Sequence, residues 1–234
     1  MSKVTDRKYR LSVKGSDLFL ASGCMIAGLI CANLFWVCNG VFDCKSFWPT
    51  ISYMACFRGN DRLFSFTMTL QGTFLLVFFI TAYANYSQFM NVFEKVMFGV
   101  LGVLISLAMP FIAMIDEAND SHILPLKEIH LGIMIGVISC SLTWTYLTYL
   151  CISKMDDDQK KQSEFLKNYI LLGLGMLVMN LLEWYYREKN NWLFNSNAEA
   201  LSEWLVVGLA LFLPYVYSLT FSPVEISLRA SSKQ

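Results

Sequence analysis

The chain has 234 residues, of which 56% are hydrophobic and only 15% are charged, and its mean hydropathy is +0.47. Soluble globular chains carry about 25% charged residues, so this composition excludes an ordinary water-soluble domain. Eighteen basic and eighteen acidic residues give zero net charge at pH 7, so no global positive field favours nucleic acid as a partner.

The apolar residues fall in six runs, each roughly as long as the 17 to 25 residues that span the hydrocarbon core of a bilayer. In chain order the runs cover residues 18–41, 63–84, 96–115, 131–152, 165–182 and 204–221. Backbone groups in lipid must be hydrogen-bonded internally, and runs without a period of two fit helices and not barrel strands. The sequence therefore predicts an all-α polytopic membrane protein, with residues 1–234 forming a single bundle of six transmembrane helices.

Basic residues near the helix ends predict the orientation of this bundle, because Lys and Arg are retained in the cytoplasm. With the N-terminus placed there, the cytoplasmic side holds twelve of them: Lys3, Arg7, Lys8, Arg10, Lys14, Lys95, Lys154, Lys160, Lys161, Lys167, Arg229 and Lys233. The lumenal side holds six: Lys45, Arg58, Arg62, Lys127, Arg187 and Lys189. Both termini are therefore expected in the cytoplasm. The first run is too long for a signal-peptide core of about 7 to 15 residues, so we interpret it as a retained helix.

Five of the seven cysteines fall into two groups. Cys24, Cys31 and Cys38 recur every seven residues along the first run, and we interpret them as small packing residues. Cys44 and Cys56 share the first lumenal loop, in an oxidising compartment, so we predict that they form a disulfide, with two free thiols as the alternative.

Two further features concern modification and ligands. The sequon Asn119-Asp120-Ser121 lies in a predicted lumenal loop, so Asn119 is a candidate glycosylation site, although so short a pattern also recurs by chance. The two histidines, His122 and His130, share no metal-binding spacing, so neither a metal site nor a cofactor is expected.

Gly132 and Gly136 form a small-xxx-small pattern in the fourth run. Such patterns let helix backbones approach closely. The pattern predicts either packing inside the bundle or self-association between protomers.

Four ionisable residues converge on the predicted lumenal face: Arg62, His130, Glu183 and Glu203. Ionisable groups in a membrane are costly and indicate function by default. Each also has a structural interpretation: Glu203 lies near a predicted helix N-terminus, His130 is a neutral hydrogen-bonding residue, and Arg62 snorkels. Glu183 lies near a predicted helix C-terminus, where the dipole disfavours an anion, and so requires a cationic partner. We predict that the four form one connected cluster that binds membrane lipids or other membrane proteins.

Several short motifs follow one another along the chain. They are Phe47-Trp48-Pro49-Thr50-Ile51-Ser52, Ile129-His130, Leu182-Glu183-Trp184 with Arg187-Glu188-Lys189, Ser202-Glu203-Trp204, and Leu219-Thr220-Phe221. Together they resemble the DRAM/FRAG/SFK family of six-span membrane proteins, which includes the damage-regulated autophagy modulators and Golgi proteins of GPI-anchor lipid remodelling. Through this resemblance Pro49 and Ser52 join the candidate binding residues.

The resemblance implies two alternative functions. The motifs around Glu183 and Glu203 most resemble the autophagy modulators, which implies a non-enzymatic regulator in a lysosomal or related endomembrane. The segment Arg58-Gly59-Asn60-Asp61-Arg62 is closer to the GPI-remodelling branch, which implies a participant in acyl transfer in the Golgi or endoplasmic reticulum. That second function would need His130 within hydrogen-bond reach of a carboxylate such as Glu203.

Overall fold

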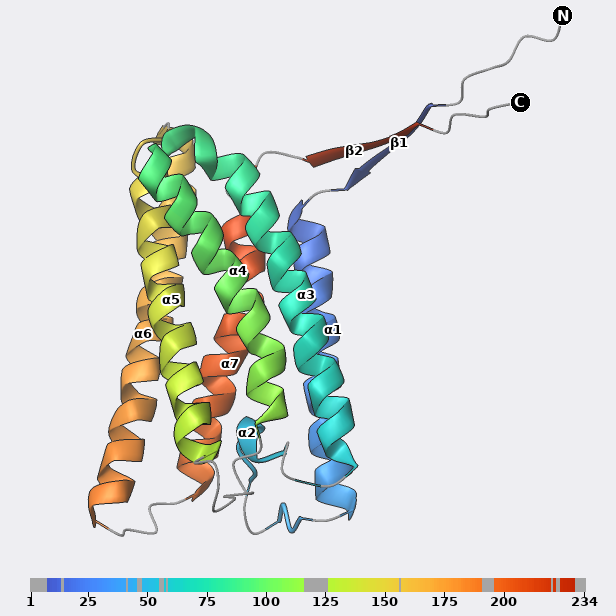
Figure 1. Cartoon of the computed structure of the whole chain (residues 1–234), viewed down its shortest axis with the longest axis vertical. Helices are drawn as coiled ribbons and strands as arrows, with labels where there is room; N and C mark the ends of the chain where they lie inside the picture. The colour runs from blue at the N-terminus through green and yellow to red at the C-terminus, as the bar shows by residue number, and fades with distance from the viewer. Residues whose placement is uncertain are drawn as a thin grey trace, which may run out of the picture.

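The computed structural model describes residues 8–13, 15–40, 42–45, 48–54, 57, 59–115, 126–155, 157–190, 196–219, 221 and 224–229. Six long helices run alternately up and down in Figure 1: α1 (Gly15–Gly40), α3 (Asn60–Tyr86), α4 (Val92–Met114), α5 (Leu126–Ile152), α6 (Asp157–Asn190) and α7 (Ser196–Ser218). Shorter elements are helix α2 (Ile51–Met54), the 3-10 turn η1 (Ser87–Phe89), and strands β1 (Lys8–Val13) and β2 (Val224–Arg229). The predicted helical bundle is confirmed.

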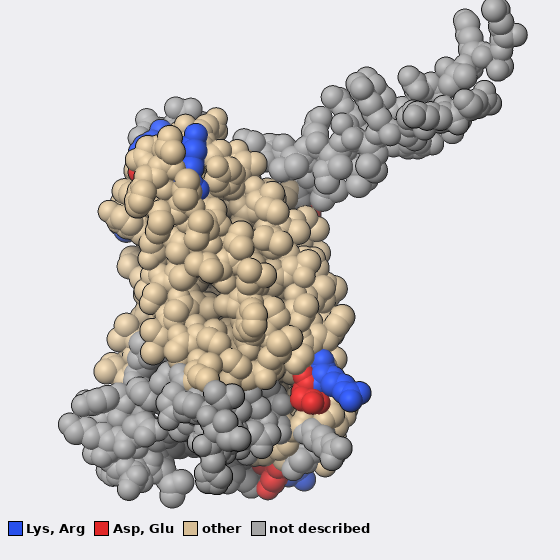
Figure 2. All heavy atoms as spheres, viewed as in Figure 1, with Lys and Arg blue, Asp and Glu red and all other residues tan. Residues whose placement is uncertain are grey.

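The surface of the bundle is suited to lipid. Four stretches are long and apolar enough to cross a membrane, namely Gly15–Gly40, Asn60–Phe89, Val92–Met114 and Gly132–Ile152. On the face shown in Figure 2, Lys, Arg, Asp and Glu lie at the two ends and leave the middle of the bundle uncharged. The fifth and sixth predicted spans coincide with α6 and α7, and the apolar part found in α7, Glu203–Ser218, is shorter. The count of six spans stays a prediction.

Strands β1 and β2 form an antiparallel ribbon that the sequence analysis did not predict. Lys8 pairs with Arg229, and Val13 pairs with Val224. The ribbon places the first and last described segments at the same end of the bundle (Figure 1). A transmembrane hydropathy window of about 19 residues does not detect six-residue strands whose partners lie at opposite ends of the sequence.

The helices form a closed ring, in which α1 contacts α3 and α7, α4 contacts α3 and α5, and α6 contacts α5 and α7. Glycines allow the closest approaches. A Cβ at Gly72 of α3 would lie 2.5 Å from the backbone oxygen of Ser106 in α4, and one at Gly102 of α4 would lie 2.8 Å from Phe79. At Gly23 of α1 it would lie 3.2 Å from the backbone oxygen of Leu211 in α7. Small residues therefore set the spacing between these helices.

Gly132 and Gly136 behave differently from these glycines. Both are exposed, and a Cβ at either position would meet no atom within 4 Å. They therefore do not pack inside the bundle, and self-association through them stays a prediction.

Two apolar clusters fill the ring. Near the ribbon, the ring of Trp144 lies 4.6 Å from Phe98, 4.9 Å from Phe79 and 5.1 Å from Tyr217, measured between centroids, so one indole joins four helices. The second cluster lies toward the opposite end and includes Ile51 and Met54 of α2.

The helices extend beyond the predicted spans, and this corrects the placement of two site residues. The α7 helix begins at Ser196, so Glu203 lies two turns inside it and not at its N-terminus. The α6 helix continues to Asn190, so Glu183 lies well before its C-terminus. Hydropathy reports the part of a helix that lies in lipid, whereas backbone hydrogen bonding continues into the interface. The dipole arguments made for both carboxylates are therefore wrong.

Candidate functional site

A short loop helix closes the end of the bundle opposite the ribbon (Figure 1). Ile51 and Met54 of α2 are buried in the same apolar cluster as Val37 of α1 and Phe64 of α3. A four-residue helix has no stability of its own, because helix nucleation is unfavourable, so tertiary contacts must hold α2. We call residues 48–54 together with Glu203 and Trp204 the α2 platform.

The α7 helix holds this platform through two hydrogen bonds. The backbone N–H of Ile51 donates to Oε2 of Glu203 at 3.0 Å, and Nε1 of Trp204 donates to the backbone oxygen of Pro49 at 3.1 Å. Ile51 is the first residue of α2, so its N–H has no acceptor within that helix, and a carboxylate from α7 supplies one. Charge-assisted bonds of this kind are stronger than neutral ones. Glu203 thus has an identifiable role in fixing the loop.

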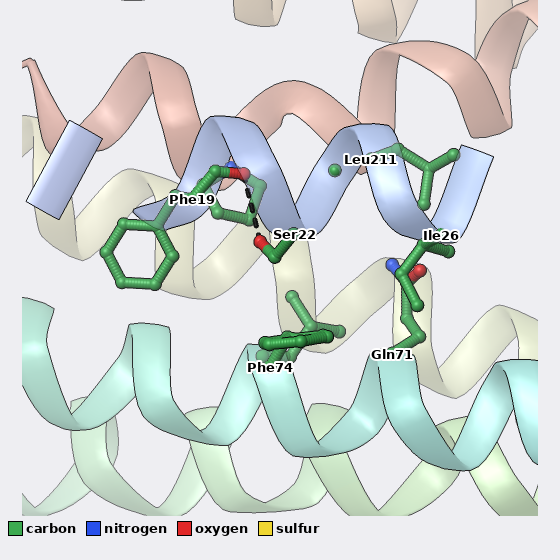
Figure 3. Close-up of a pocket in the computed structure, with 9 residues that line it drawn as sticks. Phe19, Ser22, Ile26, Gln71, Phe74 and Leu211 are labelled. Atoms are coloured by element: carbon green, nitrogen blue, oxygen red, sulfur yellow. Dashed lines mark hydrogen bonds between the residues drawn. The ribbon is translucent and has the colours of Figure 1, made fainter. Parts of the chain in front are cut away.

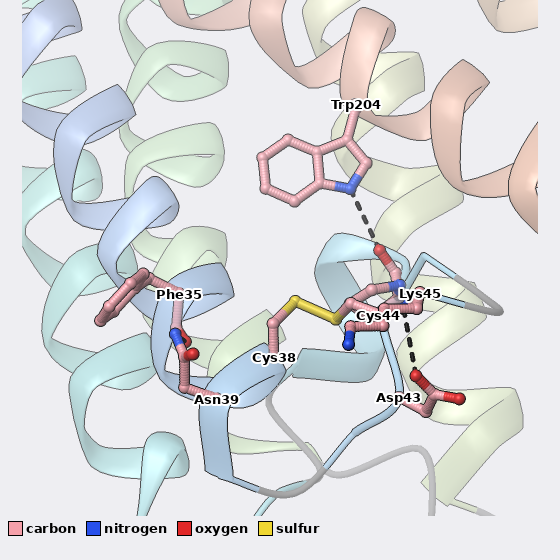
Figure 4. Close-up of a disulfide and its surroundings, with 8 residues drawn as sticks. Phe35, Cys38, Asn39, Asp43, Cys44, Lys45 and Trp204 are labelled. Carbon is pink, nitrogen blue, oxygen red and sulfur yellow. Dashed lines mark hydrogen bonds between the residues drawn. A yellow bond between two sulfur atoms is a disulfide. The ribbon is translucent and has the colours of Figure 1, made fainter.

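A disulfide fixes the other side of the platform. Cys38, in the last turn of α1, is bonded to Cys44, with 5.3 Å between the two Cα atoms. Figure 4 shows this bond beside Trp204. The predicted pairing of Cys44 with Cys56 is therefore wrong in its partner, since Cys44 forms one disulfide, and Cys56 lies outside the described residues. Cys38 lies in the last turn of α1, which ends at Gly40, so its sulfur reaches Cys44 in the loop that follows.

The start of α3 completes the site. Nδ2 of Asn60, which is buried, donates to the backbone oxygen of Met54 at 2.8 Å and so ties α3 to α2. Gly59 has φ of 95°, a conformation that favours glycine, and a Cβ there would lie 3.2 Å from the ring of Trp36. Trp36 is therefore held next to the turn that precedes Arg62.

Basic and aromatic side chains are exposed around the platform. Arg62, in the first turn of α3, and Lys45 are exposed, and Trp48 and Trp36 have exposed fractions of 50% and 39%. Trp prefers the membrane–water interface, and Arg and Lys there interact with phosphate headgroups. Asp43 and Asp61, close in sequence to the two basic residues, are exposed as well, so this rim carries charges of both signs beside its two indole rings.

The structure describes the other predicted site residues only in part. His130 lies in the second turn of α5 and is 5% exposed. Ser52 and Glu183 lie in α2 and α6, but their side chains are outside the described part of the structure, as are Asn119 and its loop. The structure thus links Glu203 to the segment containing Pro49 and Ser52, and a connected cluster of all four ionisable residues stays a prediction.

Two functional contacts were missed by sequence reasoning. Trp204 was noted only as part of the Ser202-Glu203-Trp204 motif, and its bond to Pro49 joins residues 155 positions apart. Cys38 was taken for a packing residue. The motifs containing Pro49 and Trp204 signalled that both segments matter, but no sequence pattern states that they touch.

A cavity in the described helices lies elsewhere, between α1, α3 and α7. It is lined by Ser22, Gln71, Phe74 and Leu211, among others (Figure 3), and none of its lining residues belongs to α2. Its volume of about 10 Å³ holds at most one water molecule. It is too small for a metabolite or a lipid headgroup.

Comparison with known proteins identifies the family. The model of the Frag1/DRAM/Sfk1/Cwh43P N-terminal domain matches residues 18–224, and the chain belongs to this family. No curated protein and no solved structure gives a significant match. Together with the four long apolar helices, membership makes the chain a multi-pass integral membrane protein.

Proposed function

We propose that this protein is a non-enzymatic regulator, of the kind that the autophagy modulators represent, and that it acts through lipids or membrane partners recognised at the α2 platform. The observation that carries the proposal is that Glu203 and Trp204 fasten the loop to α7. A loop fixed by two hydrogen bonds, a disulfide and a buried apolar pair is preorganised for recognition. Glu203 also uses one carboxylate oxygen to hold a backbone N–H, which favours a structural role over proton transfer.

The proposed topology has six spans with both termini in the cytoplasm and the platform in the lumen. The pairing of β1 with β2 supports an even number of crossings, because it joins the two ends of the chain on one side. The surplus of basic residues at that side supports the cytoplasmic assignment. In sealed vesicles of an endomembrane the cytoplasmic face points outward, so external protease should digest tags at both termini, and digestion of one tag alone would contradict an even count.

The ligand that fits the exposed rim is a phosphate-bearing lipid. Arg62 and Lys45 supply charge, and Trp36 and Trp48 supply rings suited to headgroup depth. A second candidate function, participation in GPI-anchor remodelling, is favoured by Arg62 in particular, since that residue lies in the segment that resembles the remodelling branch. The proposed location is a lysosomal or related endomembrane, with Golgi or endoplasmic reticulum as the alternative.

The test is complementation of cells that lack the protein. Autophagic flux, cellular lipids and surface display of GPI-anchored proteins are measured after return of the wild type, Arg62→Gln, Trp48→Ala, or the control Lys167→Gln. Lys167 is also exposed and basic but lies on α6, near the cytoplasmic end of the proposed topology. We expect the first two variants to restore flux poorly while the control restores it fully. Defective GPI-protein display with normal flux would favour the remodelling function instead.

A further inference from the structure

The ribbon at the other end of the bundle has two unlike faces. Residues paired across an antiparallel ladder occupy the same face, and successive residues along a strand alternate between faces. The register places Tyr9, Leu11 and Val13 with Leu228, Ile226 and Val224 on one face. It places Lys8, Arg10 and Ser12 with Arg229, Ser227 and Glu225 on the other. One face is entirely apolar, and the other is polar with three basic residues and one acidic residue.

An isolated ribbon of this kind needs something to cover its apolar face. A two-stranded sheet is at best marginally stable in water without a further packing surface. The extensive contacts of β1 and β2 are with each other, and Figure 1 shows the ribbon extending away from the helices. Among the described elements, no helix shares backbone contacts with the ribbon as extensive as those between its two strands.

The ribbon is joined through short connections to two helices of the bundle. Strand β1 ends at Val13, and α1 enters its apolar span from Gly15, two residues later. Strand β2 begins at Val224, six residues after α7 ends at Ser218. Strand β1 thus ends, and strand β2 begins, close in sequence to a helix of the bundle, and the paired residues nearest to these helices are Val13 and Val224.

The polar face carries the charge that anionic lipids attract. Lys8 and Arg229 are directly opposed in the ladder, and like charges in that position destabilise a sheet. A phosphate group beside them would relieve this repulsion. Residues 1–14 carry five basic residues and one acidic residue in a chain with zero net charge, so positive charge is concentrated here. Each Lys or Arg near an anionic leaflet contributes about 1 kcal/mol, which corresponds to roughly fivefold in affinity.

We propose that the β1–β2 ribbon is a lipid-binding element that lies in the interface of the membrane spanned by the bundle. Its apolar face contacts the acyl boundary, and its basic face lies at the level of anionic headgroups, as in other interfacial amphipathic segments. The element binds the negatively charged leaflet on the side of the termini. The inference takes from the proposed function only that this leaflet is the cytoplasmic one.

The test places a photocrosslinking residue, benzoylphenylalanine, at either of two neighbouring positions in the full-length protein. Leu11 belongs to the apolar face, and Ser12 is its matched control on the polar face. The proteins are reconstituted in vesicles of phosphatidylcholine with or without phosphatidylserine, and lipid adducts are measured by mass spectrometry. Ile226 and Ser227 on β2 form a second, independent pair, which keeps the test decisive if one labelled protein does not fold.

We expect several-fold more lipid adduct at Leu11 and Ile226 than at Ser12 and Ser227. Arg10→Gln and Arg229→Gln should each lower the phosphatidylserine share of the adducts by up to about fivefold. Equal yields on the two faces would overturn the proposal, and so would adducts joining two copies of the protein. Both lipid leaflets of such vesicles are alike, so a reversed topology or a failed complementation experiment leaves this result unaffected.

Discussion

The contact between Gly72 of α3 and α4 leads to a quantitative prediction. Pro110 of α4 has no N–H with which to bond the carbonyl of Ser106, four residues earlier, and it is that carbonyl oxygen that Gly72 approaches. A Cβ at position 72 would lie 2.5 Å from this oxygen and 3.3 Å from Cδ of Pro110. Gly72→Ala therefore forces the two helices apart.

The size of the effect follows from the overlap. Favourable carbon–oxygen contacts lie at about 3.3 to 3.6 Å, so the helices must separate by roughly 1 Å. A gap of that size loses a quarter to a half of the dispersion energy of each affected contact. We therefore expect Gly72→Ala to lower the free energy of unfolding by about 1 to 3 kcal/mol, the usual cost of overpacking.

The assay is reversible unfolding of the full-length protein in mixed micelles of increasing denaturing-detergent content, followed by circular dichroism. The matched control is Gly28→Ala on α1, where a Cβ would meet no atom within 4 Å, and its stability should equal or slightly exceed that of the wild type. Pro110→Ala restores an N–H for the Ser106 carbonyl, so we expect it to couple to Gly72→Ala by at least about 0.5 kcal/mol. Equal stability of the Gly72 and Gly28 variants would refute this account of the α3–α4 contact.

Three further predictions concern single contacts. Non-reducing peptide mapping should recover Cys38 joined to Cys44. Cys38→Ser should lower the free energy of unfolding by about 2 kcal/mol, as expected for so short a closed loop. Nδ2 of buried Asn33 donates to Oγ1 of Thr67 at 3.2 Å, so the cycle of Asn33→Leu and Thr67→Val should give a coupling energy of about 0.6 kcal/mol. The Asn91 side chain accepts from the N–H of Glu94 at 2.8 Å, so Asn91→Ala should lower the free energy of unfolding by about 1 kcal/mol.

Each of these predictions has a clear opposing result. If Cys44 could be alkylated without prior reduction, the predicted disulfide would be refuted. Additive effects of the Asn33 and Thr67 substitutions would mean that the observed bond contributes nothing. Unchanged stability of Asn91→Ala would show that the start of α4 is held by tertiary packing alone, whereas Asn91→Asp serves as the control that keeps an acceptor.

Much of the fold could be predicted because lipid imposes simple rules on sequence. Uninterrupted apolar runs predicted the positions of the six long helices to within several residues. The short motifs identified the family. Helix ends were less accurate, since nothing in hydropathy marks where α7 begins at Ser196. This error carried into the site, because it placed Glu203 at a helix terminus.

The candidate site was only partly predictable for a different reason. The sequence identified Pro49, Glu203 and the predicted first lumenal loop as candidates for the site. The hydrogen bonds that connect this loop to α7 join residues more than 150 positions apart. Such contacts depend on how α7 packs against α1, which no local pattern encodes. The ribbon escaped prediction in the same way, although the alternation in residues 8–13 is visible once its partner strand is known.

The closed ring of helices has a consequence for biosynthesis. The α7 helix covers Gly23 of α1 and also supplies Glu203 and Trp204 to the α2 platform, yet it is translated after the five other long helices. During translation the surface of α1 that α7 will cover therefore stays exposed, and residues 48–54 lack their two bonds to α7. A chain truncated before α7 would carry both defects at once, one in the ring of helices and one at the loop. The last helix to be synthesised therefore completes both the ring and the α2 platform.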